Sequence, residues 1–484
     1  MGTKRTFTEG KIFSPLISFA FPVLIALFLQ AMYGAVDLWV VGKFGSAADV
    51  SAVATGGQVT YTVTVVIVGL SMGITVLIGQ KIGEGREKEA GQVIGSGICM
   101  FLLISIALTA AMLLSAEPLA HLMQAPEAAL SQTADYLRIC FAGTAFIVAY
   151  NVLGSVFRGI GDSKMPLITV AIACVFNIIG DLIFVAVFHM GTQGAALATV
   201  MAQAFSVLLS IFIIRRRMLP FSLCKKDLRP EKKHIQKILS LGAPVAFQDL
   251  LVNISFLVIM AIVNSMGVIA SAGVGVAEKL CVFIMLVPSA YMQSMAAFVA
   301  QNVGAKRLDR AGKALLYGIL SSLVVGLVMA YLSFFHGSAL STLFVKENDT
   351  AVIMAASDYL RAYSIDCILT SFLFCFIGYF NGRGKTLFVM IQGIVGAFGV
   401  RIPVSYLMTL TDGASLFHIG LATPASSVVQ ILLCAGYFLL LKRRQKKFLL
   451  ENSAEYHRPE QKNACLFPGV GGFFPSEKML YHTL

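Results

Sequence analysis

The chain has 484 residues, of which 57% are hydrophobic and only 13% are charged. Soluble domains carry roughly 25% charged residues, and the mean hydropathy here is +0.81, so a water-soluble globular protein is excluded. The net charge of +12 would suggest a nucleic-acid partner in a soluble chain, but in a membrane protein it is typical of basic cytoplasmic loops.

Twelve apolar runs are long enough to cross a bilayer, because about 20 apolar residues span its hydrocarbon core as a helix. Membrane barrel strands would instead be short and strictly alternating. The sequence therefore predicts an all-α integral membrane protein with twelve transmembrane helices. In chain order the predicted spans are 14–40, 52–79, 91–116, 131–157, 165–188, 193–214, 239–264, 271–300, 314–336, 357–380, 386–411 and 417–441.

Basic residues gather on one side of this predicted bundle. Of the 37 Lys and Arg, 31 fall in the two termini and in the connections on the same side as the termini. Even if Arg138 and Arg361 are counted outside the membrane, only four lie on the opposite side. Such a bias predicts a multi-pass protein of the cell membrane with both termini cytoplasmic, and it makes the basic clusters topology signals rather than a nucleic-acid site.

The nine cysteines are scattered through the chain, with no CxxC motif and no metal-ligand spacing. Most of them lie inside predicted spans, where cysteine behaves as a small apolar residue. We therefore expect no disulfide, no bound transition metal and no redox chemistry.

The second half of the chain repeats the first at an offset of 221 to 223 residues. Each half holds six spans, so both halves enter the membrane from the same side and form parallel repeats around a central cavity, the architecture of alternating-access transporters. The clearest matches are Pro22 with Pro244, Gln80-x-x-Gly83 with Gln301-x-x-Gly304, Asp135-Tyr-Leu-Arg138 with Asp358-Tyr-Leu-Arg361, and Phe157-x-Gly159-x-Gly161 with Phe380-x-Gly382-x-Gly384.

These repeats define the expected organisation of the chain. Residues 1–214 form an N-terminal six-helix lobe that carries an ion or proton site, and 239–441 form the C-terminal lobe. Between them 215–238 is a basic cytoplasmic linker, and 442–484 is a loose cytoplasmic tail.

Polar residues inside the spans of the N-terminal half point to one pocket, because intramembrane charges are rare and are functional by default. Asp37 and Asp181 fall at comparable depth. As a pair they can share a proton, and with neighbouring oxygens they suit Na⁺, so the ion stays open. The alternatives are that Asp37 is an interfacial residue and that Asp181 has a structural partner. The helical spacing places together Gln30, Tyr33 and Asp37, then Asn177 and Asp181, with Thr199 in the next span.

The C-terminal half does not copy this pocket, because Asp37 and Asp181 correspond to Ile259 and Val404. Its own intramembrane charges are secondary candidates, and the pairs Glu278 with Lys279 and Asp366 with Arg401 are expected to be structural ion pairs more readily than ligands. Pro22 and Pro244 are either simple kinks or gating kinks. The secondary candidates are Asp249, Glu278, Lys279, Asp366 and Arg401.

Several motifs together resemble the multidrug and toxic compound extrusion (MATE) family, and its bacterial DinF-like branch in particular. The resemblance covers about residues 10–441. Its motifs are Pro22…Gln30…Tyr33…Val36-Asp37…Val41-Gly42, the paired Gln-x-x-Gly at 80 and 301, Phe157-Arg-Gly-Ile-Gly-Asp162-Ser-Lys, and Ala300-Gln-Asn-Val-Gly-Ala-Lys.

This resemblance implies an antiporter that exports amphipathic, often cationic, compounds in exchange for inward Na⁺ or H⁺. The glutamate that the related NorM-like branch carries on its seventh span has no match here, since Val252 and Asn253 stand near its position. By resemblance, the coupling residues are Asp37, Asn177, Asp181 and Thr199, and the polar lining of the same lobe is Gln30, Tyr33, Tyr136 and Asn151.

The expected protein is a transporter and not an enzyme, a monomer in the lipid bilayer with no cofactor beyond its coupling ion. Two rival functions agree less well with the sequence. A flippase for a lipid-linked precursor would line its cavity with many cations, whereas only Lys279 and Arg401 lie in mid-membrane here. A membrane-embedded prenyl-type transferase would need Asp-rich motifs, and no DDxxD-like sequence occurs.

Overall fold

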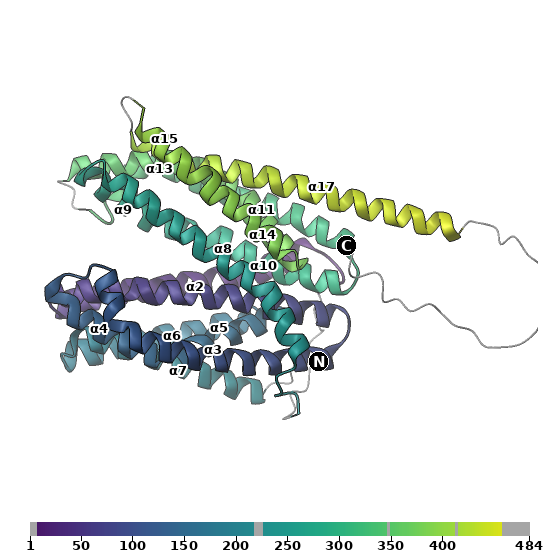
Figure 1. Cartoon of the computed structure of the whole chain (residues 1–484), viewed down its shortest axis with the longest axis horizontal. Helices are drawn as coiled ribbons and strands as arrows, with labels where there is room; N and C mark the ends of the chain where they lie inside the picture. Colours follow the sequence, from purple (N-terminus) through teal and green to yellow (C-terminus); the bar gives the residue numbers. More distant parts are fainter. Residues whose placement is uncertain (1–6, 217–225, 346–348, 412–414, 457–484) are drawn as a thin grey trace, which may run out of the picture.

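The computed structural model describes residues 7–216, 226–345, 349–411 and 415–456, and within these ranges it is helical without a strand. Figure 1 shows the long helices lying roughly side by side in two groups. Each of the twelve predicted spans is helical, which confirms the fold class. The described part of the chain has 11 helices long and apolar enough to cross a membrane, or up to 12 when a bent pair is counted as one span.

The N-terminal half builds its spans from seven α-helices and one π-helix. The bent pair is α4 with α5, whose axes differ by 53°. The elements are α1 (Phe13–Phe44), α2 (Ala47–Gly83), α3 (Glu87–Leu122), α4 (Glu127–Ala142), α5 (Thr144–Ile160), α6 (Lys164–Asp181), the π-helix η1 (Leu182–Val187) and α7 (Gly191–Arg216).

The C-terminal half repeats this plan with shorter pieces in some spans. Its elements are α8 (Lys232–Asn264), α9 (Val268–Ile284), α10 (Leu286–Gly304), α11 (Leu308–Phe335), α12 (Gly337–Ser341), α13 (Thr350–Gly382), α14 (Thr386–Ile394), the π-helix η2 (Val395–Arg401), α15 (Ile402–Thr409), α16 (Leu416–Gly420) and α17 (Ala422–Tyr456).

The expected loose tail begins later than 442, because α17 continues to Tyr456. The segment Lys442–Lys447 consists of Lys, Arg and Gln, which all favour the helix, so the last span continues beyond its apolar part. The rest of the expected tail, 457–484, lies outside the described residues, as does 217–225 of the expected linker.

The first helix of each half begins by packing against the core of the other half. Leu16, Phe19 and Val23 of α1 belong to a core cluster of the C-terminal half, together with Phe298 and Phe380. Asp37, in the last third of the same helix, instead lies with residues of the N-terminal half.

The first helix of the second repeat does the same in the opposite direction. Ile238, Leu241 and Val245 of α8 pack into an N-terminal cluster with Ile74 and Val148. Figure 1 shows α8 running obliquely across the bundle, from the N-terminal group of helices to α9 in the C-terminal group. The halves therefore interlock where α1 and α8 begin.

The repeated motifs of the sequence meet at this interlocked end, which also carries the Lys- and Arg-rich connections and is called the basic end below. Gln301 donates from Nε2 to the carbonyl of Gly159 at 3.0 Å. Gln80 donates to the carbonyl of Gly382 at 3.3 Å. These bonds are reciprocal, because Gln80 and Gln301 are equivalent in the repeat, as are Gly159 and Gly382.

Glycine lets the two backbones come into contact here. A Cβ on Gly83 would overlap the carbonyl oxygen of Gln301, and a Cβ on Gly304 would overlap that of Gln80. The Gln-x-x-Gly repeat is thus a contact of each motif with its own copy. We call Gln80, Gly83, Gln301, Gly304 and the two acceptor glycines the Gln–Gly junction.

The start of the chain covers this junction. The Arg310 guanidinium donates to the carbonyls of Phe7, Glu9, Gly10 and Lys11 at 2.6 to 3.0 Å. The Phe7 ring lies against Phe298 of the C-terminal half and beside Gly161 of the N-terminal half. Backbone contacts, hydrogen bonds and the packed Phe7 ring therefore close the basic end.

The close backbone contact at the Gln–Gly junction predicts that replacing its two contact glycines with alanine opens the basic end. Gly83→Ala combined with Gly304→Ala forces the backbones apart, so a thiol placed at Ala300, which is fully buried beside Gly79, becomes reachable. In an otherwise cysteine-free variant in detergent, we expect maleimide labelling of Ala300→Cys to be at least about tenfold faster. The matched control is Gly312→Ala, whose Cβ meets no atom within 4 Å. Equal labelling rates in the double variant and the control would contradict the close contact.

Candidate functional site

Two carboxyl groups face each other inside the N-terminal half. Asp37 lies on α1 and is 4% exposed, and Asp181 is the last residue of α6 and is fully buried. Their side chains are within hydrogen-bonding reach of each other. That contact requires a proton or a cation between them, because two bare carboxylates repel.

Two further predicted residues complete the cluster. Thr199 of α7 donates from Oγ1 to Oδ2 of Asp37 at 3.1 Å, and Asn177 of α6 donates from Nδ2 to that hydroxyl at 3.4 Å. The structure therefore brings together Asp37, Asn177, Asp181 and Thr199 from three helices. We call these four residues the acid cluster.

The acid cluster holds more acceptors than donors. Oδ1 of Asp37, both carboxylate oxygens of Asp181 and Oδ1 of Asn177 are buried without a donor among the described residues. Within the same residues no ion pair involves either acid, and no group of three or more His, Cys, Asp or Glu is found. Unsatisfied buried acceptors are costly, so this arrangement fits a proton or a hard cation bound by mixed oxygens.

The local backbone explains how the cluster forms. Immediately after Asp181 the helix widens into η1, and π-helical turns are frequent at functional sites. A Cβ on Gly180 would lie 3.0 Å from Ala198, so α6 and α7 pack closely next to Thr199. No pattern in the sequence signalled the π-helix.

Tyr136 belongs to the wall of the acid cluster. It is 4% exposed and sits in an apolar group with Val40, Val53 and Val185. A Cβ on Gly56 would overlap its ring, which fixes the ring against α2. This aromatic and aliphatic wall keeps water from the acids, and Tyr136 does not line the cavity described next.

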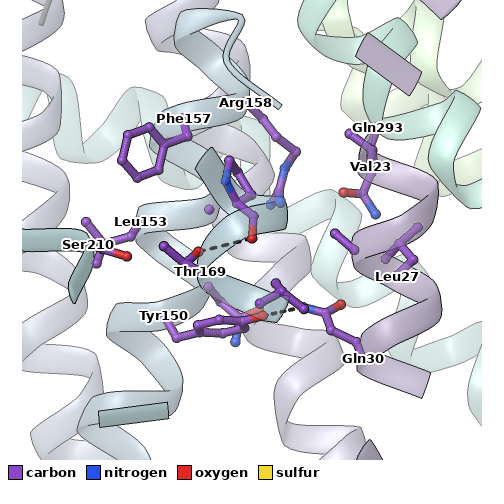
Figure 2. Close-up of a pocket in the computed structure, with 15 residues that line it drawn as sticks. Val23, Leu27, Gln30, Tyr150, Leu153, Phe157, Arg158, Thr169, Ser210 and Gln293 are labelled. Carbon is purple, nitrogen blue, oxygen red and sulfur yellow. Dashed lines mark hydrogen bonds between the residues drawn. The ribbon is translucent and has the colours of Figure 1, made fainter. Parts of the chain in front are cut away.

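Gln30 and Asn151, two of the predicted lining residues, face a cavity of about 40 Å³ in the basic-end part of the N-terminal half. Figure 2 shows Gln30 donating to the Tyr150 hydroxyl, at 2.9 Å. Tyr33 lies next to this cavity and donates to the carbonyl of Val170 at 3.3 Å.

The sequence alone does not identify five polar residues that line this cavity, which are Tyr150, Arg158, Thr169, Ser210 and Gln293. Arg158 was counted among the basic residues of a connection, because it stands only two residues before the end of α5. Gln293 comes from α10 of the other half, and its place could be found only once the halves were packed together.

The C-terminal charges do not form the expected ion pairs. Asp366 and Arg401 are both buried, yet no ion pair within 4 Å joins them. Arg401 instead donates to Ser255 at 3.1 Å and lies over the Phe256 ring at 4.5 Å. The guanidinium is held by a hydroxyl and an aromatic face, which also compensate a buried cation.

Glu278 and Lys279 are likewise unpaired with each other in the described structure, since helical neighbours point in different directions. Lys279 is exposed, and Glu278 and Asp249 are partly buried. These three charges do not come together with the acid cluster into one site.

The remaining expectations concern proline and cysteine. Pro22 lies inside α1 and Pro244 inside α8, and neither ends its helix. The seven described cysteines are free, while Cys224 and Cys465 lie outside the described residues.

The comparison with known proteins agrees with this architecture. The MatE family profile matches residues 22–183 and 244–407, one match in each half. The chain is 28% identical to the probable multidrug resistance protein YpnP of Bacillus subtilis, over 86% of this chain and 92% of that protein. It is 24% identical to the multidrug export protein MepA of Staphylococcus saprophyticus, over 83% of this chain and 88% of that protein.

Solved structures share the fold. A crystal structure of a MATE protein in complex with MaL6 superposes with a TM-score of 0.86 at 19% identity, covering 92% of this chain and all of that one. With the family profile matched in both halves, the chain belongs to the MatE family and is a multi-pass membrane transporter rather than an enzyme.

Proposed function

We propose that this protein is a secondary antiporter of the cell membrane that exports amphipathic, often cationic, compounds in exchange for inward Na⁺ or H⁺. The observation that carries the proposal is the acid cluster, in which four buried oxygens have no donor among the described residues. The names of the relatives, a multidrug resistance protein and a multidrug export protein, support the class of substrate. The basic end is cytoplasmic in this proposal, and the protein acts as a monomer.

The acid cluster supplies the coupling. Placing a charged Asp in mid-membrane costs about 2.5 to 3.5 kcal/mol on insertion scales, and a proton or Na⁺ removes much of that cost. Binding the ion draws together α1, α6 and α7, which carry Asp37, Asp181 and Thr199. Because α1 also lines the cavity through Gln30, its position connects the ion to the substrate.

Exchange then requires only that ion and substrate favour different conformations of the two halves. In this structure the basic end is closed by the Gln–Gly junction. Opening the junction exposes the interior to the cytoplasm, where the ion leaves and the substrate binds. Closing it returns the site to the outside, where the ion displaces the substrate.

The acid cluster gives a direct test. Asp37→Asn and Asp181→Asn each keep the side-chain volume but remove the titratable, cation-binding carboxylate, so we expect ethidium efflux from cells to fall at least about tenfold at equal expression. Asp135→Asn is the matched control, because that acid lies in a surface ion pair with Arg138 and its loss leaves the cluster intact. Full efflux by either cluster variant would disprove the coupling role.

Reconstitution tests the energy source. The Na⁺ and H⁺ gradients are imposed separately on proteoliposomes that contain the purified protein. We expect one of the two gradients to drive ethidium transport, and we expect transport to stop when an ionophore collapses that gradient. The ion that drives transport is then the ion held by the acid cluster, and Asp37→Asn should abolish its effect. Transport that follows neither gradient would point to uncoupled movement and contradict antiport.

A further inference from the structure

The cavity beside Gln30 carries a cationic side chain that the ion-coupling mechanism does not use. Arg158 reaches into it from α5, and Figure 2 shows its guanidinium in the space between α5 and α1, with the Gln293 amide on the far side. Around it stand further polar groups from four helices. They are Gln30, Tyr150, Asn151, Thr169 and Ser210.

Arg158 has no acidic partner in the part of the chain that the structure describes. Its Nη2 donates to the Ser155 hydroxyl at 2.8 Å, while Nε is buried and has no acceptor. Among the described side chains no acid forms an ion pair with it. The acid cluster is also remote, since Asp37 is two helical turns beyond Gln30, about 10 Å farther from the basic end.

The equivalent place in the C-terminal half is built differently. At the repeat offset Arg158 corresponds to Asn381, and Tyr150 and Asn151 correspond to Leu373 and Phe374. There the space is filled by packed rings, including Phe380, Phe388 and Tyr437. Packing alone therefore does not require an arginine or a polar cavity at this position of the fold.

We propose that Arg158 binds a carboxylate or phosphate group of a transported compound, so that the transporter accepts amphipathic anions and zwitterions in addition to cations. The proposal rests on the export function proposed above and specifies its substrate class. A guanidinium fork matches the two oxygens of a carboxylate or phosphate. The free Nε is the donor that such a group would use.

The side chains around Arg158 offer apolar contacts and a hydrogen-bond donor to a bound anionic group. Val23, Leu27 and Phe157 give the cavity an apolar wall, while the amide of Gln293 offers a donor from the other half. Gln293 belongs to α10 of the C-terminal half, so both halves contribute side chains to the place where the anion would bind.

Three dansyl probes of similar size test the charge preference: dansylglycine is an anion, its amide is neutral and dansylcadaverine is a cation. Binding is measured by fluorescence with the full chain in nanodiscs. We expect Arg158→Gln to weaken dansylglycine binding about tenfold, which equals about 1.4 kcal/mol, and to change binding of the neutral amide less than about threefold. Arg158→Lys should restore part of the affinity, because it keeps the charge but not the fork.

The control is Arg86→Gln, which removes an exposed charge at the same end of the bundle and should leave all three affinities unchanged. Parent protein that binds dansylglycine no better than its amide would overturn the proposal. An equal loss of affinity for all three probes in Arg158→Gln would also overturn it, because such a loss would mean that the residue has a structural role. Asp37→Asn separates the two proposals, because it should abolish ion-driven transport while the dansylglycine preference of Arg158 remains.

Discussion

The structure depends most on one electrostatic constraint: two carboxyl groups are placed inside an apolar lobe without a basic partner among the residues that the structure describes. Asp37 and Asp181 are buried, and three of their four oxygens have no donor in the described protein. Such a pair is stable only with a proton or a cation from outside. In the proposed mechanism, a bound proton or cation joins α1 and α6 through this pair, so the positions of the two helices would depend on whether the ion is bound.

A second constraint acts at the basic end of the bundle, between α2 and α10. Glycines at 83 and 304 let the halves touch backbone to backbone, and the reciprocal bonds from Gln80 and Gln301 hold them there. Each bond is worth only about 1 kcal/mol, so this end is closed by several weak contacts that can be broken together. Because α1 takes part in both regions, with Phe19 at the junction side and Asp37 in the acid cluster, the two constraints are mechanically connected.

Residues that both repeats share can be distinguished from residues that only one repeat has. Where the N-terminal half has acids, the C-terminal half has Ile259 and Val404, and where the first has a polar cavity, the second has stacked aromatic rings. Asp366 and Arg401 of the second half interact electrostatically but form no ion pair within 4 Å, and Arg401 contacts Ser255 and Phe256. The shared motifs build the junction, while the unshared residues build the sites.

The sequence by itself determined the twelve spans, the internal repeat and the acid cluster, because hydropathy, repeated spacing and rare intramembrane acids are properties of the chain read one helix at a time. Thr199 joined Asp37 and Asp181 as predicted, since small residues such as Gly180 allow α6 and α7 to meet. Only the tertiary structure decided that Tyr136 packs in the apolar group beside the acid cluster and that Asp366 forms no ion pair within 4 Å with Arg401. It also decided that Arg158 and Gln293 line the same cavity. Those relations depend on how helices cross and rotate, and helix crossing is set by contacts between residues far apart in the sequence.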